Sequence, residues 1–331
     1  MQRLASAVIA SAIVSFTTSA AIAGPYAPGF RSVSAPAVAP GSFGVAGSAL
    51  ADGRLIALTG TELFVETGVG TGVFTVGATI DAGITGGTDP GFLTVSPDGS
   101  TIALGAGFGR PVVVFDSSLV DAGMPGSISM STASSYALDH FSAAWINNTD
   151  LAVTSAGIVT RLDTLSGATS TIVSNIGGFS AGIAFDSGGR LYTGNGFDSA
   201  PGGSGTGTIR RFDPSEWSGG AADFENDGVY VADILSASPL HFDAMGHLIV
   251  GGGNGADTGY VAVADAAGTI IQQLDPLGTS SAFYGAFVNH ATGELVVTAG
   301  SDWFVYTVPA PGAAALFGLA TITGGRRRRA C

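Results

Sequence analysis

A motif that returns about every 48 residues is the feature that most limits the folds open to this chain. Each copy has a short apolar strand, a polar turn and a second apolar strand, as in FLTVSPDGSTIAL and GIAFDSGGRLYTG. Six copies account for nearly all of residues 24–308, and their turns lie near Asp52, Asp98, Asn148, Asp186, Asp243 and His290. Strand repeats of this length are typical of propeller blades, which are four-stranded sheets arranged around an axis.

The remaining strands of each repeat follow the same logic. Third strands are visible as PVVVFD, IVTRLD, GTIRRFD, YVAVAD and WFVYTV, and four of these end in an Asp that suits a turn. The last repeat stops after WFVYTV, so we expect residues 30–38 (FRSVSAPAV) to supply its fourth strand and close the ring. Pro36 is tolerated there because a fourth strand lies at an outer edge. The prediction is an all-β propeller of six blades, each with four antiparallel strands; a seven-bladed ring and a pair of β-sandwiches are the alternatives.

The composition supports a folded, acidic body. Hydrophobic residues make up 46% of the chain, which is enough for a core although 52 of the 331 residues are Gly. Residues 24–308 hold all 25 acidic residues and seven Arg, a net charge of −18. A surface of this sign repels phosphate backbones, which argues against nucleic-acid binding.

The first 23 residues have the pattern of an export signal. Arg3 precedes an apolar stretch over residues 4–16, and Ala21 and Ala23 give the small-x-small pattern that a signal peptidase accepts before Gly24. The apolar stretch is shorter than the roughly 20 residues that span a bilayer. We therefore expect a signal helix over residues 1–23 and an exported protein; an N-terminal anchor helix is the alternative.

The last 23 residues, 309–331, have a proline motif, an apolar run over residues 312–323 and an arginine cluster, in that order. This arrangement resembles the PEP-CTERM sorting signal, although Ala310 stands where that family usually has Glu. The resemblance implies a short apolar helix, processing by an exosortase-type peptidase, and delivery to the cell surface or extracellular matrix with at least transient membrane contact through the tail only. An ordinary C-terminal anchor with cytoplasmic positive charges is the alternative. The residues that match the signal are Pro309, Pro311, Arg326, Arg327, Arg328 and Arg329.

One acidic loop is a candidate calcium site. Asp223, Glu225 and Asp227 alternate before Gly228, which resembles the start of a calcium-binding loop. Alternate carboxylates around a Gly turn present several oxygens on one side, and Ca²⁺ takes six to eight. Glu225 departs from the pattern and no Glu follows at the twelfth position, so a solvated acidic loop is the alternative.

Two turns echo each other in neighbouring repeats. Asn195 and Asp198 in the fourth repeat match Asn254 and Asp257 in the fifth, which would place all four on one face of a propeller. Such groups could bind a cation or a sugar hydroxyl, but good turn residues recur for structural reasons as well.

The sequence gives little sign of catalysis. Histidines are scattered without metal-ligand spacing; His140 and His241 fall near inner strands, where one of them could line a channel. We expect a non-enzymatic binding or matrix protein with a polysaccharide or surface-protein ligand. The alternative is a metal-dependent hydrolase or lactonase on a six-bladed propeller, which holds a divalent ion in the channel with Asp, Glu and Asn side chains. The nearest such groups are Asn147, Asp243 and Asn289.

Overall fold

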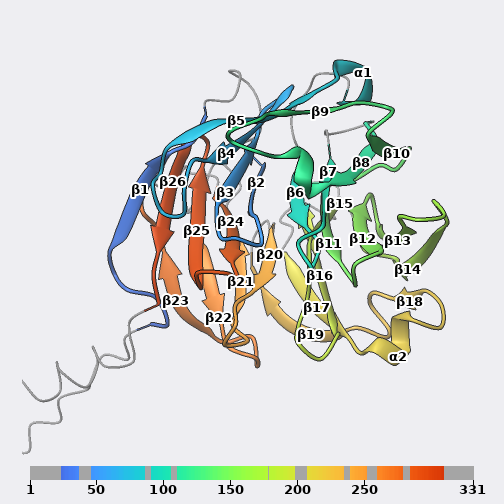
Figure 1. Cartoon of the computed structure of the whole chain (residues 1–331). Helices are drawn as coiled ribbons and strands as arrows, with labels where there is room; N and C mark the ends of the chain where they lie inside the picture. The colour runs from blue at the N-terminus through green and yellow to red at the C-terminus, as the bar shows by residue number, and fades with distance from the viewer. Residues whose placement is uncertain are drawn as a thin grey trace, which may run out of the picture.

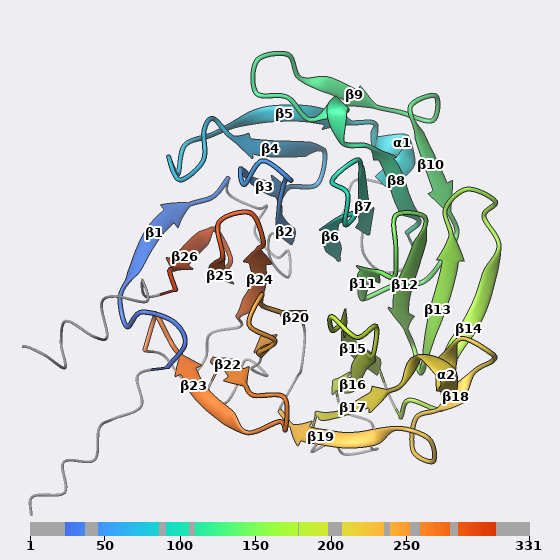
Figure 2. The same ribbon diagram turned by 60° about the horizontal axis from the view of Figure 1, so that its bottom comes forward.

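Six β-sheets stand around a common axis in the computed structural model, like the blades of a propeller (Figures 1 and 2). This arrangement confirms the predicted six-bladed, all-β fold. The structure describes residues 24–36, 46–85, 91–105, 110–177, 179–197, 207–234, 239–251, 259–278 and 284–308. The signal segment over residues 1–23 and the tail over residues 309–331 lie outside these ranges.

Each blade begins with an inner strand next to the axis and continues outward through antiparallel neighbours. Blade 1 contains β2 (Ala46–Ala49), β3 (Leu55–Leu58), β4 (Glu62–Glu66) and β5 (Phe74–Ile80). Blade 2 contains β6 (Phe92–Val95), β7 (Thr101–Gly105), β8 (Val112–Asp116) and β10 (Ala133–Tyr136). Blade 3 contains β11 (Ser142–Trp145), β12 (Asp150–Ser155), β13 (Ile158–Asp163) and β14 (Thr169–Ser174).

The second half of the chain repeats this order. Blade 4 contains β15 (Phe179–Phe185), β16 (Leu191–Phe197), β17 (Thr208–Phe212) and β19 (Val229–Asp233). Blade 5 contains β20 (Leu240–Phe242), β21 (Leu248–Gly251), β22 (Val261–Ala264) and β23 (Ile270–Leu274). Blade 6 contains β24 (Gly285–Asn289), β25 (Glu294–Ala299), β26 (Asp302–Tyr306) and, from the N-terminus, β1 (Phe30–Ser34).

The ring closes as the sequence predicts. β1 pairs antiparallel with β26, from Phe30 opposite Tyr306 to Ser34 opposite Asp302, and forms the outer edge of blade 6. Figure 2 shows β1 beside β26 although they stand at opposite ends of the chain. A blade shared between the two ends therefore joins the N-terminal strand to the last repeat by backbone hydrogen bonds.

Two blades have a fifth strand that the sequence pattern did not predict. β9 (Gly126–Ile128) leaves blade 2 to pair parallel with β5 of blade 1, and β18 (Ala222–Asp223) leaves blade 4 to pair parallel with β14 of blade 3. Both segments lie between the third and fourth strands of their own repeats. They cover outer edges whose N–H and C=O groups would otherwise lack strand partners, and they tie neighbouring blades together.

The hydrophobic core is divided among the blade interfaces. Six clusters of buried side chains occur among the described residues, one between each pair of neighbouring blades. Trp303, for example, is fully buried between blades 6 and 1, with edge contacts to Phe74 and Phe287. Both faces of a blade are therefore apolar, which is why the strands read as nearly continuous hydrophobic runs rather than as alternating ones.

The polar residues that punctuate the repeats hold the hairpins. Asp186 Oδ1, for instance, accepts backbone N–H bonds from Gly188 at 2.9 Å and from Arg190 at 3.0 Å. Gly99 sits in the corresponding turn of blade 2 at φ +75°, and a Cβ there would come within 2.4 Å of the Ala51 Cβ. Turn chemistry and the close approach of neighbouring turns therefore explain the recurrence of Asp and Gly.

Helices play a minor part in the described chain. They are α1 (Ala82–Thr85), the 3₁₀ turn η1 (Ser117–Leu119) and α2 (Pro214–Trp217). Across the parts of the chain that the structure describes, no helix has the length and apolarity needed to cross a membrane.

Candidate functional site

A cavity of about 670 Å³ opens at the end of the central channel where the six inner strands finish. Each of the six blades contributes to its wall one residue from the same position of its inner strand, shortly before the hairpin turn. In every blade this residue pairs with the same position of the second strand, so the six residues lie at one level and form a ring around the axis. The ring consists of Ser48, Thr94, Ala144, Ala184, His241 and Phe287.

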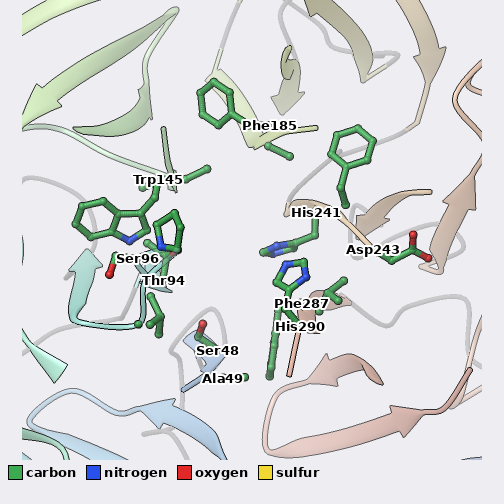
Figure 3. Close-up of a pocket in the computed structure, with 18 of the residues that line it drawn as sticks. Ser48, Ala49, Thr94, Ser96, Trp145, Phe185, His241, Asp243, Phe287 and His290 are labelled. Carbon is green, nitrogen blue, oxygen red and sulfur yellow. The ribbon is translucent and has the colours of Figure 1, made fainter. Parts of the chain in front are cut away.

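Two imidazoles meet on one side of this cavity. His241 is the only titratable member of the ring, and His290 follows β24 in the turn of the next blade. Figure 3 shows the two rings next to each other. The two histidines come together because the repeated motif ends the inner strands of blades 5 and 6 at the same level of the channel.

Both imidazoles are held in the neutral form at pH 7. Burial in the channel and, as the smaller cause, the positive charge that His290 can carry lower the pKa of His241 to about 4. His290 is exposed at the cavity surface, and partial loss of water there lowers its pKa, while the negative charge of Asp243 acts in the opposite direction. Two uncharged imidazoles facing one cavity are suited to accept protons and hydrogen bonds from a bound ligand.

Aromatic side chains form the other walls. Trp145 lies across the cavity from the two histidines, and Phe185 stands beside it on the next blade (Figure 3). Trp145 is only 7% exposed, and its buried indole Nε1–H has no hydrogen-bond partner. Because the Nε1 atom itself is buried, a ligand in the cavity reaches this donor only if the indole turns toward it, and an acceptor supplied there would then satisfy the N–H.

The carboxylate and amide side chains that could bind a hard metal ion already have hydrogen-bond partners in the protein. Asp243 accepts four hydrogen bonds: from the N–H groups of Met245 and His247, from the His247 imidazole and from the Tyr26 hydroxyl. Because its four lone-pair sites are taken, this carboxylate has no oxygen directed into the channel for a cation.

The two amides are occupied in the same way. Asn289 is fully buried; its Nδ2 donates to the Gly53 carbonyl at 2.9 Å and its Oδ1 accepts from the Ala291 N–H. Asn147 accepts three hydrogen bonds within its own turn and donates to Asp150. The described lining therefore does not fit a divalent ion that requires six or more oxygens.

The predicted calcium loop joins two blades. Asp223 lies at the end of β18, accepts from Asn175 of blade 3 and from the N–H groups of Glu225 and Asn226, and Glu225 pairs with Arg210 at 2.6 Å. Asp227 accepts from the Asp223 N–H. Among the described residues, no group of three or more His, Cys, Asp or Glu is arranged to hold a metal ion. These contacts explain the loop as an inter-blade clasp, and calcium binding there stays a prediction.

The predicted pair of ligand-face turns is only partly visible. Asn195 lies in β16, is 8% exposed and has an Oδ1 without a partner. Asp198, Asn254 and Asp257 lie outside the described residues, as do the sorting-signal residues and the alanines of the cleavage site. His140 is buried away from the cavity, with its ring against Phe92 and its Nδ1 at 3.0 Å from the Leu138 carbonyl oxygen.

Comparison with known proteins gives fold matches without sequence matches. No protein family and no curated protein matches the sequence. A gluconolactonase from Xanthomonas campestris matches 86% of this chain and 91% of its own, with TM-score 0.59 and 15% identity. A putative gluconolactonase matches 86% and 94%, with TM-score 0.57 and 13% identity. A calcium-binding regucalcin from Agrobacterium tumefaciens matches 81% and 90%, with TM-score 0.53 and 13% identity.

These matches correct the functional prediction. The expectation of a non-enzymatic binding or matrix protein was wrong, because the similar propellers include enzymes named as lactonases. They favour the alternative, a hydrolase or lactonase on a six-bladed propeller. At 13–15% identity the likeness itself establishes only the fold, so the activity must be argued from the site.

Sequence reasoning missed His290 as a channel residue. The sequence analysis assigned His290 only to the turn of the sixth repeat. It named His241, together with His140, as a histidine near an inner strand. Aligning the six repeats by their strand pairs would have placed His241 in a ring otherwise made of Ser, Thr, Ala and Phe. No sequence signal shows that His290 turns back toward it, because that contact joins two blades.

Proposed function

We propose that this protein is a hydrolase that opens a lactone or a related ester within the central channel. The observation that carries the proposal is the pair of neutral imidazoles facing a cavity that has the Trp145 indole in its opposite wall. The fold likeness to proteins named as gluconolactonases supports the choice of ester chemistry.

His290 is the general base in this scheme. A base works best when its pKa lies near the working pH, and the pKa of His241, at about 4, is too low for that task. Asp243 counteracts the effect of water loss on His290, so His290 is the more basic of the two. His290 takes a proton from a water molecule, and the resulting hydroxide attacks the carbonyl carbon of the ester.

Trp145 provides the donor for the carbonyl oxygen. As the water oxygen bonds to the carbonyl carbon, negative charge develops on the carbonyl oxygen. The indole N–H, which is buried in this structure and turns toward the substrate, stabilises that charge without first breaking another hydrogen bond. The intermediate then collapses: the ring C–O bond breaks, and the protonated His290 returns its proton to the leaving alkoxide. The product is a hydroxy acid. His241, uncharged, accepts a hydrogen bond from a substrate hydroxyl or from the attacking water.

Hydrolysis by the full-length protein tests this function. A panel of five- and six-membered lactones and linear esters would be followed by acid release, in the presence of chelator because the described lining does not fit a hard cation. We expect His290→Gln to lower kcat by about 10²-fold or more, as for loss of a general base, with KM little changed. Absence of hydrolysis for every substrate, or full activity in His290→Gln, would reject the proposal.

Matched variants separate chemistry from packing. Trp145→Phe should lower kcat by about 10²-fold, because it removes one donor to the developing oxyanion. Trp217→Phe is the control, since Trp217 is also 7% exposed with an unpartnered Nε1 but lies in the outer core between blades 3 and 4. His140→Gln is the corresponding control for His290, since His140 is buried outside the cavity.

For the chain ends we propose export and surface sorting. Support comes from the order of motifs in residues 1–23 and in residues 309–331. N-terminal sequencing of the exported protein should begin at Gly24. Replacement of the arginine cluster by Ser should change the distribution of the protein between the membrane and the cell surface in fractionated cells; an unchanged distribution would refute the sorting role of the tail.

A further inference from the structure

The N-terminal segment reaches the channel through one side chain. Tyr26 is 2% exposed and belongs to the core cluster between blades 5 and 6. Its backbone N–H donates to Gln272 Oε1 at 3.0 Å, and its carbonyl accepts from Gln272 Nε2 at 3.1 Å. Ala27 N–H donates to the Thr307 carbonyl at 2.9 Å. The backbone on either side of the Tyr26 ring is thus fixed to two different blades.

The Tyr26 hydroxyl ends on a carboxylate of the cavity wall. It donates to Asp243 Oδ2 at 3.0 Å, and the His247 imidazole shares the same oxygen at 2.8 Å. Burial, followed by the charge of Asp243, raises the pKa of Tyr26 far above its usual range. The phenol therefore stays protonated, and so remains a donor, across the neutral pH range.

The step from Asp243 to His290 is electrostatic, since the described contacts hold no hydrogen bond between the two. Both line the cavity, and the carboxylate charge favours the protonated imidazole. Among the described residues that line the cavity, the titratable groups next to His290 are His241 from β20 and Asp243 from the turn after it. Asp243 therefore opposes the neutral state that loss of water imposes, to a degree that depends on where its oxygens point and how many donors they already have.

We propose that Tyr26 is a positioning residue of the channel: its hydroxyl fixes the orientation and charge density of Asp243, and Asp243 sets the proton affinity of His290. The catalytic part of this inference depends on the hydrolase proposed above, whereas the coupling itself does not. It gives the N-terminal segment a second role besides ring closure, because docking of residues 24–34 completes the environment of the base.

The test is NMR titration of the four histidine rings in the folded full-length protein, with His290 assigned by His290→Gln. Tyr26→Phe removes one donor from Asp243, which leaves more negative charge near His290. We expect the pKa of His290 to rise by about half a pH unit. Asp243→Asn removes the charge and should move the pKa of His290 the opposite way.

Tyr284→Phe is the matched control. Tyr284 is fully buried and its hydroxyl donates to Asp275 at 2.6 Å, so the same kind of bond is lost away from the cavity. The control should lose similar stability in urea and leave the His290 titration unchanged. If Tyr26→Phe also leaves it unchanged while Asp243→Asn shifts it, Tyr26 only packs, and the inference is overturned. If neither variant shifts it, Asp243 does not act on His290, and the inference is equally overturned.

Activity gives a separate readout. In Tyr26→Phe the pH at which kcat declines on the acid side should shift with the pKa of His290 measured by NMR, while KM stays constant. A protein that shows the NMR coupling but hydrolyses no ester would refute the proposed function and leave the coupling intact.

Discussion

Acid should destabilise this fold through His241, and the effect can be worked out from its burial. The pKa of an ordinary His is about 6.5, and that of His241 in the channel is about 4. Each unit of difference corresponds to about 1.4 kcal/mol, so complete protonation of His241 costs about 3 kcal/mol of folding free energy. Replacement of His241 by Gln removes the titrating group and keeps a polar side chain of similar length.

The sign follows from proton binding. Because the pKa of His241 is lower in the folded state, the unfolded chain binds more protons between pH 6.5 and pH 4. The contribution of neutral His241 is therefore fully present above pH 6.5 and is lost as the pH falls toward 4. His140 and His290, whose pKa values loss of water also lowers, add to the same trend.

The assay is urea unfolding of the wild type and His241→Gln at 25 °C, from pH 7.5 down to pH 4. The free energy of unfolding should fall more steeply in the wild type, by an extra 1.4 kcal/mol or so per pH unit below 6. The variant should keep a shallower slope from the other two histidines. Parallel curves would refute the reasoning, since they would show that the channel does not desolvate His241.

Three further predictions concern packing and the loops. Trp303→Ala should lower the free energy of unfolding in urea by about 3–5 kcal/mol, because a fully buried side chain is lost between blades 6 and 1; a loss below 1 kcal/mol would contradict the inter-blade core. Asn289→Ala should cost about 1–3 kcal/mol because it leaves the buried Gly53 carbonyl without its donor, and unchanged urea unfolding would argue against this contact. The predicted calcium site is checked by thermal melts with calcium and with chelator: a calcium-dependent rise that Asp223→Asn abolishes would establish the site. An unchanged melt would show that Asp223 and Asp227 serve only the protein donors that they already accept.

The ring could be predicted because its causes are local. Every hairpin needs turn residues at a fixed place, and every blade needs two apolar faces, so the pattern recurs with a period of about 48 residues. The unfinished last repeat likewise predicted that β1 would complete blade 6. The Asp residues that end the third strands, such as Asp163, which accepts from the N–H groups of Leu165 and Ser166, were correctly assigned to turns.

The fifth strands could not be predicted, because β9 and β18 are three and two residues long and their partners belong to other blades. The same limit applied to the acidic loop. Its sequence pattern resembles a calcium loop, while only the tertiary structure brings Asn175 and Arg210 to its carboxylates.

The amino-acid sequence by itself determined the number of blades, the closure of the ring and the places of the turns, since each depends on neighbours along the chain. The tertiary structure decided the site. His241 and His290 are 49 positions apart and meet only because their inner strands stand side by side around the axis, and Tyr26 reaches Asp243 across 217 positions. The channel also sets the chemistry of these groups, because the withdrawal of water that lowers the pKa of both histidines exists only when all six blades are assembled.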